Sequence, residues 1–168
     1  TRLRDTLDVF SRAPIFIDDE PGNNIMRMRA VSRRMKAEHG LGLIIVDFLQ
    51  LMVPRTSSDS VVQQVTEISR SLKSLARELD VPVVALSQLN RAVESRGGEP
   101  RLSDLRDSGS IEQDADVVLF IHREYREDGP GRDNVAKILI AKHRNGPVGQ
   151  VDLFFDQNLV SFSSIEKG

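Results

Sequence analysis

Short apolar runs alternate with longer segments of helical periodicity along this chain, which is typical of an α/β fold. The apolar runs are Ile15 to Ile17, Leu43 to Val46, Pro82 to Leu86 and Val117 to Ile121. Each is continuously apolar, as expected for strands that are covered on both faces of a parallel sheet. We therefore predict a mostly parallel sheet with helices on both of its faces.

Two segments have the spacing of amphipathic helices. Apolar residues three or four positions apart run from Asn24 to Glu38, where Asn23 or Asn24 is a plausible N-cap and Gly40 a C-terminal stop. The segment from Asp59 to Leu79 carries one apolar stripe and leads directly into a predicted strand. This second helix is therefore expected to pack on the core and not to form a coiled coil.

The end of the chain has a different pattern. Val135 to Ala141 and Val151 to Phe155 flank the turn-rich segment His143-Arg-Asn-Gly-Pro147. An Asn-Gly pair between two strand-like runs is a strong hairpin signal, so we predict an antiparallel edge to the sheet. The stretch Glu124 to Asp133 is expected to be a surface loop, and residues 1–168 are expected to form part of a single domain.

Composition narrows the functional class. The chain has 168 residues, 39% of them hydrophobic, and no cysteine, which excludes disulfides and thiolate metal sites. No apolar run approaches the roughly 20 residues of a membrane span, so a cytoplasmic protein without membrane contact is expected. Since the first residue is Thr1, we expect a fragment or a processed product. The net charge of −2 predicts that any nucleic acid is held by a few well-aimed groups.

The run from Leu43 to Asp47 places an acid at the carboxyl end of a predicted buried strand. Ligands of open α/β sheets bind outside the carboxyl ends of strands, and nucleotide-hydrolysing motors use an acid there to hold magnesium. An ordinary strand-ending Asp that caps the next segment is the alternative. Ser87 and Gln88 follow the next predicted strand, where a glutamine can sense a terminal phosphate. No G-x-x-x-x-G-K-[ST] phosphate loop occurs in the sequence.

Four segments together resemble the successive motifs of the bacterial replicative DNA helicase (DnaB) family. They are Val46 to Met52, Leu86 to Arg91, Asp104 to Asp116 and Ala141 to Pro147. The resemblance implies a RecA-like motor of the P-loop NTPase type that works as a homohexameric ring. It also implies 5′ to 3′ movement on single-stranded DNA with ATP and Mg²⁺, and a primase and a helicase loader as partners of the full-length protein.

In that family the Walker A loop and the catalytic glutamate precede the position where this chain begins. The chain is therefore expected to be a partial domain that does not hydrolyse ATP alone. The resemblance assigns the magnesium-coordinating Walker B acid to Asp47 and the phosphate-sensing glutamine to Gln88.

Lys142 and Arg144 match the pair of cations that reaches the γ-phosphate bound on a neighbouring subunit. A hairpin tip projects beyond its sheet, and side chains at i and i+2 of a strand point the same way. Arginine supplied in trans is worth ~10³ or more in rate in other NTPases. Without the resemblance, two solvated cations at a turn would be the simpler interpretation.

By resemblance, DNA contact falls on Arg106, Asp107 and Gly109. The family commonly has glutamate at the position of Asp107, so this side chain has the shorter reach of the two. A short helix is predicted from Ile111 to Asp114, and free N–H groups at a helix start favour phosphate oxygens. The alternative is a helix-capping turn.

Two other functions remain open from the sequence. One is a different RecA-like ATPase, such as a recombination protein, a circadian-clock protein or a phage helicase-primase. The other is a non-catalytic module that binds subunits or DNA. His39, His122 and His143 have no ligand spacing, so a histidine metal site is not expected.

Overall fold

The computed structural model describes residues 2–20, 22–54, 60–90, 92–126, 131–132 and 134–165, without the side chains of residues 2, 3, 92, 94, 106–108, 125, 126, 131 and 132. The helices are α1 (Arg2–Arg12), α2 (Ile25–His39), α3 (Val61–Leu79), α4 (Ala92–Arg96) and α5 (Gly109–Asp114), with 3-10 helices η1 (Leu49–Leu51) and η2 (Leu102–Ser108). The strands are β1 (Ile44–Val46), β2 (Val83–Ala85), β3 (Val117–His122), β4 (Tyr125–Arg126), β5 (Gly131–Arg132), β6 (Val135–His143), β7 (Gly149–Asp156) and β8 (Ser161–Ser164).

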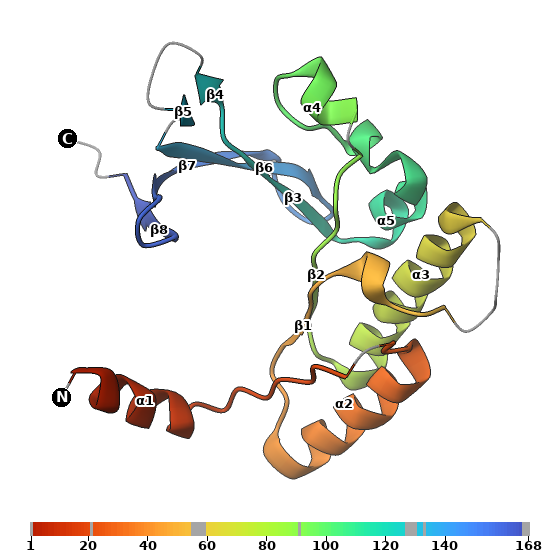
Figure 1. Ribbon diagram of the computed structural model, residues 1–168. Helices are drawn as coiled ribbons and strands as arrows, with labels where there is room; N and C mark the ends of the chain where they lie inside the picture. The colour runs from red at the N-terminus through yellow and green to blue at the C-terminus, as the bar shows by residue number, and fades with distance from the viewer. Residues whose placement is uncertain are drawn as a thin grey trace.

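β1 and β2 form a short parallel sheet in which Val46 pairs with Ala85. Helices α2 and α3 lie on one side of this pair (Figure 1), and the apolar side chains between them form the main core. That core contains Ile25, Val46, Leu49, Met52, Ile68, Leu72, Leu75, Leu79 and Val81. Ile45 and Val84 point away from it and are 64% and 50% exposed. Within the described chain, the prediction of helices on both faces is therefore wrong for this sheet.

The caps of α2 and α3 confirm the predicted helices. The Asn24 side chain accepts a hydrogen bond from the Arg27 N–H at 2.9 Å, and Gly40 ends α2 with a left-handed φ of 73°. The Ser60 side chain caps α3, which begins at Val61. The predicted start of that helix at Asp59 lies outside the described residues. None of the described helices combines the length and the apolar composition needed to cross a membrane.

Four antiparallel strands form the larger sheet, in the order β3-β6-β7-β8. The predicted hairpin is confirmed as β6 and β7, and each strand extends beyond its predicted limits. β3 was expected to be a parallel neighbour of the first sheet, but it pairs with β6, with Phe120 opposite Leu139. The prediction of a mostly parallel sheet is thus wrong for the described residues, because the strong local hairpin supplies the partner of β3.

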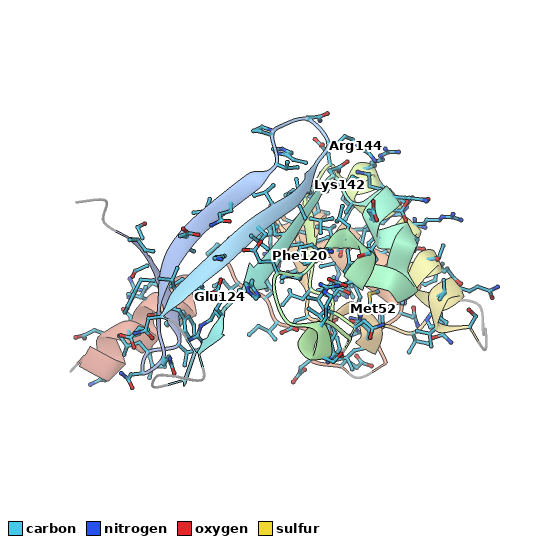
Figure 2. The ribbon with its side chains drawn as sticks, turned by 90° about the horizontal axis from the view of Figure 1, so that it is seen from above. Met52, Phe120, Glu124, Lys142 and Arg144 are labelled. Atoms are coloured by element: carbon cyan, nitrogen blue, oxygen red, sulfur yellow. The ribbon has the colours of Figure 1, made fainter. Side chains whose placement is uncertain are left out.

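A second core cluster joins this sheet to the helices. Leu105, Val118 and Phe120 are buried together, and Ile111 of α5 packs against both this cluster and the main core. Figure 2 shows Phe120 between the sheet and the helical layer. On the other face of β3, Leu119 and Ile121 are 56% and 64% exposed.

The segment Ile15 to Ile17 is extended but is not a strand, which corrects the prediction. Ile15, Phe16 and Ile17 are 65%, 57% and 87% exposed. A strand needs a neighbour to exchange backbone hydrogen bonds, whereas the Ile15 N–H bonds only locally, to the Ala13 carbonyl. The segment follows α1, which was not predicted and which lies away from the rest of the described chain (Figure 1). Within the predicted loop from Glu124 to Asp133, β4 and β5 pair as a small antiparallel sheet.

Replacing Leu75 by alanine tests the main core. Leu75 is fully buried at 0% exposure, so Leu75→Ala removes apolar contacts and leaves a cavity. We expect the free energy of unfolding to fall by about 2–5 kcal/mol, measured by chemical denaturation followed by circular dichroism. The control is Val61→Ala on the same helix, because Val61 is 58% exposed. Equal losses for the two variants would contradict the proposed packing of α3.

Candidate functional site

The polar residues Asp47 and Gln88 follow the carboxyl ends of two adjacent parallel strands. The Leu86 N–H donates to the Val46 carbonyl, and the Leu49 N–H donates to the Leu86 carbonyl, both at 2.9 Å. These bonds keep the two chain segments together beyond the last residue pair of the sheet. Asp47 and Gln88 therefore lie at the same edge of the sheet, and both are exposed.

Gln50 connects the two strand ends and was not singled out from the sequence. Its amide Nε2 donates to the Ser87 Oγ at 3.1 Å, and its Oε1 accepts the Gln88 N–H at 3.4 Å. Leu49 and Met52 are buried on either side of it, so η1 is fixed by packing while the Gln50 side chain stays at the surface. The sequence pattern that could have identified Gln50 is a polar residue among apolar ones, three positions after the strand-ending Asp47.

The chemistry of this edge fits a magnesium ion carried by a nucleotide. Mg²⁺ usually takes one or two protein carboxylates and completes its shell with phosphate oxygens and water. Asp47 supplies one exposed carboxylate, and no group of three or more metal-ligating side chains occurs among the described residues. Asp47 is therefore suited to a metal bound jointly with a phosphate and not to a closed metal site.

Lys142 and Arg144 lie at the end of β6 beside α5, far from Glu124 at the other end of the sheet (Figure 2). The Lys142 Nζ donates to the Glu112 carbonyl, and the Arg144 Nη2 donates to the Gln113 carbonyl at 3.2 Å. Both side chains therefore point to the same side, as their spacing predicts. The last carbonyls of a helix carry partial negative charge, so the end of α5 attracts both cations.

A bulge in the ladder lies next to these cations. Val118 pairs with Lys142 and Leu119 with Ile140, so Ala141 is an extra residue on β6. Bulges re-aim the side chains beside them. Within the described chain, the polar contacts of the Lys142 and Arg144 side chains are with residues 112–116, and none is with Asp47 or Gln88.

Asp116 is an acid that the sequence motif contains but whose role was not predicted. Its carboxylate forms ion pairs with Lys73 of α3 and, at 3.3 Å, with Arg144. The hydrogen bond from Lys73 holds the pKa of Asp116 below its ordinary value, and the positive charges of Lys73, Arg144 and Arg77 add to the effect. Asp116 is therefore ionised at neutral pH.

The predicted DNA-contacting residues lie where η2 passes into α5. Arg106 and Asp107 belong to η2, and their side chains are outside the described part of the structure. Gly109 is the first residue of α5, two residues earlier than the predicted helix start. Because α5 follows η2 without an intervening turn, the separate helix start expected there is not formed. A Cβ placed on Gly109 would meet no atom within 4 Å.

Asp104 fixes the start of η2, a structural role that was not predicted from the sequence. It is 8% exposed and accepts two hydrogen bonds of 2.8 Å from the Arg96 guanidinium. It also accepts the Arg101 N–H at 2.7 Å. The Arg96 hydrogen bonds, followed by that of Arg101, hold the pKa of Asp104 below its ordinary value.

The lowered pKa of Asp104 gives a prediction for pH dependence. A carboxyl whose pKa is lower in the folded state stabilises the fold above its unfolded pKa and loses this effect as pH falls through the folded pKa. Asp104→Asn should therefore lower the denaturation midpoint at neutral pH, and the difference from the native sequence should shrink under acid. The control is Asp8→Asn, which removes an exposed ion pair with Arg12 in α1. A difference that persisted unchanged in acid would contradict this role of the carboxylate.

The sequence of this chain is similar to those of known replicative helicases. The family model described as "DnaB-like helicase C terminal domain" matches residues 1–164. The chain is 45% identical over 185 residues to the replicative DNA helicase DnaB of Rickettsia prowazekii, with 99% of the chain and 38% of that protein covered.

Two solved structures have the same fold as this chain. One, titled "ATPase Domain of G40P", matches with a TM-score of 0.91 and 41% identity over 98% of this chain and 59% of its own. The other is titled as the structure of a DnaB-like replicative helicase and its interactions with primase. It also matches with a TM-score of 0.91 and 41% identity, and the match covers 98% of this chain and 40% of that structure's chain. The described fold is thus a mixed α/β portion of a RecA-like ATPase domain, and the chain spans well under half of the length of the Rickettsia relative.

Proposed function

This chain belongs to the family of DnaB-like helicase C-terminal domains, and we propose that it forms part of the motor of an ATP-dependent replicative DNA helicase. The complete protein would act as a ring-shaped homohexamer in the cytoplasm, moving 5′ to 3′ on single-stranded DNA and unwinding the duplex at the replication fork. Primase and a helicase loader would be its partners. The observation that carries the proposal is the family match along residues 1–164 together with the paired polar strand ends.

In this proposal Asp47 and Gln88 serve the nucleotide bound by their own subunit. Asp47 would hold Mg²⁺, which offsets phosphate charge when it is bound. Gln88 would hydrogen-bond the terminal phosphate or the attacking water, and Gln50 would keep the Gln88 backbone in register with the strand edge. The phosphate loop would come from the remainder of a complete RecA-like domain, in which we expect a mostly parallel sheet covered on both faces. The chain alone would then not turn over ATP.

Lys142 and Arg144 would serve the nucleotide of the adjacent subunit. Support comes from their common direction at the end of the β6–β7 hairpin and from the partial exposure of Arg144, whose side chain is 43% exposed. An arginine that enters a neighbour's site stabilises the negative charge that develops on the transferred phosphoryl group. ATP would thus be hydrolysed at subunit interfaces.

The trans assignment predicts how Arg144→Ala behaves in the full-length hexamer. We expect the rate constant for ATP hydrolysis to fall by roughly 10³-fold, while nucleotide binding measured with a fluorescent analogue stays largely intact. Hexamers mixed from native and variant subunits should lose more activity than the variant fraction alone explains, because each variant subunit silences its neighbour. Arg12→Ala, an exposed arginine of α1, is the control. Loss confined to the variant's own site would exclude action in trans.

DNA contact is proposed for Arg106, Asp107 and Gly109, on the strength of the motif from Asp104 to Asp116. Contacts to phosphate carry no sequence information, which suits a motor that travels over any sequence. Few contacts per subunit, repeated around a ring, also accord with the net charge of −2.

Arg106→Ala tests this contact in the full-length protein. Affinity for single-stranded DNA should fall about equally for different sequences, and the slope of log K against log salt should decrease by about 1. Fluorescence anisotropy across a salt series measures both quantities. Arg33→Ala, which removes an exposed ion pair with Glu78 on the helical layer, is the control. An unchanged salt slope would count against a phosphate contact.

A further inference from the structure

The guanidinium of Arg144 is held on one side by its own subunit. Its Nη1 lies 3.3 Å from the Asp116 Oδ1, and its Nη2 donates to the Gln113 carbonyl at 3.2 Å. The backbone is fixed as well, since the Arg144 N–H donates to the Asp116 carbonyl at 2.8 Å. These contacts restrain both the base and the head of a side chain that otherwise has many rotamers.

Asp116 is anchored in turn by a different element. Its other carboxylate oxygen, Oδ2, binds the Lys73 Nζ of α3. The Lys73 side chain is 20% exposed, whereas that of Asp116 is 53% exposed. A line of alternating charge, Lys73–Asp116–Arg144, therefore connects the packed helix α3 to the end of β6.

These contacts leave Arg144 able to bind a further anion. A guanidinium has five N–H donors. With the described residues, Arg144 makes one side-chain hydrogen bond, through Nη2, and one ion pair, through Nη1, so most of its donors stay available. Because Lys73 already shares the charge of Asp116, the carboxylate does not fully neutralise Arg144. A phosphate approaching the exposed side would meet an arginine that is both oriented and still positively charged.

We propose that Asp116 is a positioning residue for Arg144, and that Lys73 holds Asp116 in place for this purpose. This inference rests on the proposed action of Arg144 on the neighbouring subunit's nucleotide. A planar guanidinium binds phosphate through a fixed fork, so its orientation matters as much as its charge. Misplacement of a reacting or stabilising group by about 1 Å costs on the order of 10²-fold in rate.

Lys142 provides an internal comparison. Its Nζ is bound by the carbonyls of Glu112 and Gln113 and has no carboxylate partner among the described residues. Removing the charge of Asp116 should therefore disturb the aim of Arg144 and leave Lys142 in place. The effect of the change should accordingly act through Arg144 alone.

The test is Asp116→Asn in the full-length hexamer. We expect kcat for ATP hydrolysis to fall by about 10²-fold with KM unchanged. In mixed hexamers this smaller loss should fall on the neighbouring subunit's site, as the loss in Arg144→Ala does. The double variant Asp116→Asn with Arg144→Ala should be no slower than Arg144→Ala alone. Asp116→Glu, which keeps the charge, should recover part of the rate.

Asp114→Asn is the matched control. Asp114 also lies at the end of α5, but its carboxylate accepts from the Ser69 Oγ at 2.8 Å and has no contact with Arg144 within the described chain. The asparagine amide oxygen can still accept that bond from the Ser69 hydroxyl, so Asp114→Asn should keep α5 in place and leave kcat near the native value. Lys73→Met supplies a second test, because it removes the anchor of Asp116 and should lower kcat in the same direction without changing KM. Hexamer assembly of every variant is checked by gel filtration.

The outcomes separate this inference from the proposed function. If Arg144→Ala fails to silence the neighbouring site, the trans function itself fails. If Arg144→Ala silences it but Asp116→Asn leaves kcat unchanged, or lowers it further in the double variant, the positioning role is overturned while the trans function stands. If Asp116→Asn does not assemble, Lys73→Met decides, and an unchanged kcat in that variant overturns the role.

Discussion

The packing of α3 is the constraint on which both halves of the described structure depend. Leu72 and Leu75 on its apolar side are buried against the parallel strands. Ser69 and Lys73 on another side of the helix bind Asp114 and Asp116. One helix therefore sets the position of the strand ends that carry Asp47 and Gln88 and also the position of α5. Lys142 and Arg144 bind carbonyls at the end of α5. The position of α3 therefore also determines where these two cations lie.

The two groups of site residues are kept apart by this architecture. Asp47 and Gln88 lie at the carboxyl edge of a short parallel sheet, whereas Lys142 and Arg144 lie at the end of an antiparallel hairpin. Ala141, the extra residue of the β6 bulge, precedes Lys142 and helps to set the direction of both cations. In the proposed function, Asp47 and Gln88 would serve one nucleotide and the two cations would serve the nucleotide of a neighbour, so that two subunits would complete each site together.

Features governed by local interactions could be predicted from the sequence. Caps at Asn24 and Gly40 lie within one turn of the helix that they bound, and the Asn145-Gly146 turn joins strands that are neighbours in sequence. Strand partners could not be predicted in this way. An apolar run such as Val117 to Ile121 indicates a buried strand, but its composition does not determine which other strand pairs with it. Its pairing with β6 depends on a hairpin further along the chain. The same limit explains why Ile15 to Ile17 looked like a strand.

The candidate site shows the same division. Asp47, Gln88, Lys142 and Arg144 were found from strand ends, a turn and the family motifs, while their roles remain proposals. Gln50 and Asp116 were missed because their partners lie 37 and 43 residues away in sequence, and no local pattern reports such a contact. Asp104 was missed although its partner Arg96 is only 8 residues away, because the salt bridge spans a loop without regular periodicity.

The charge of the chain also has to be considered locally. A net charge of −2 conceals a cluster in which Lys73, Arg77 and Arg144 all act on the single carboxylate of Asp116. Charges more than about 8–10 Å apart are largely screened in physiological salt, so an approaching phosphate responds to this cluster and not to the total. The carboxylate of Asp116 reduces the mutual repulsion of these cations and gives the arginine a fixed direction. In the proposed function, this arrangement would let a chain with a net charge of −2 present an arginine to an anionic nucleotide.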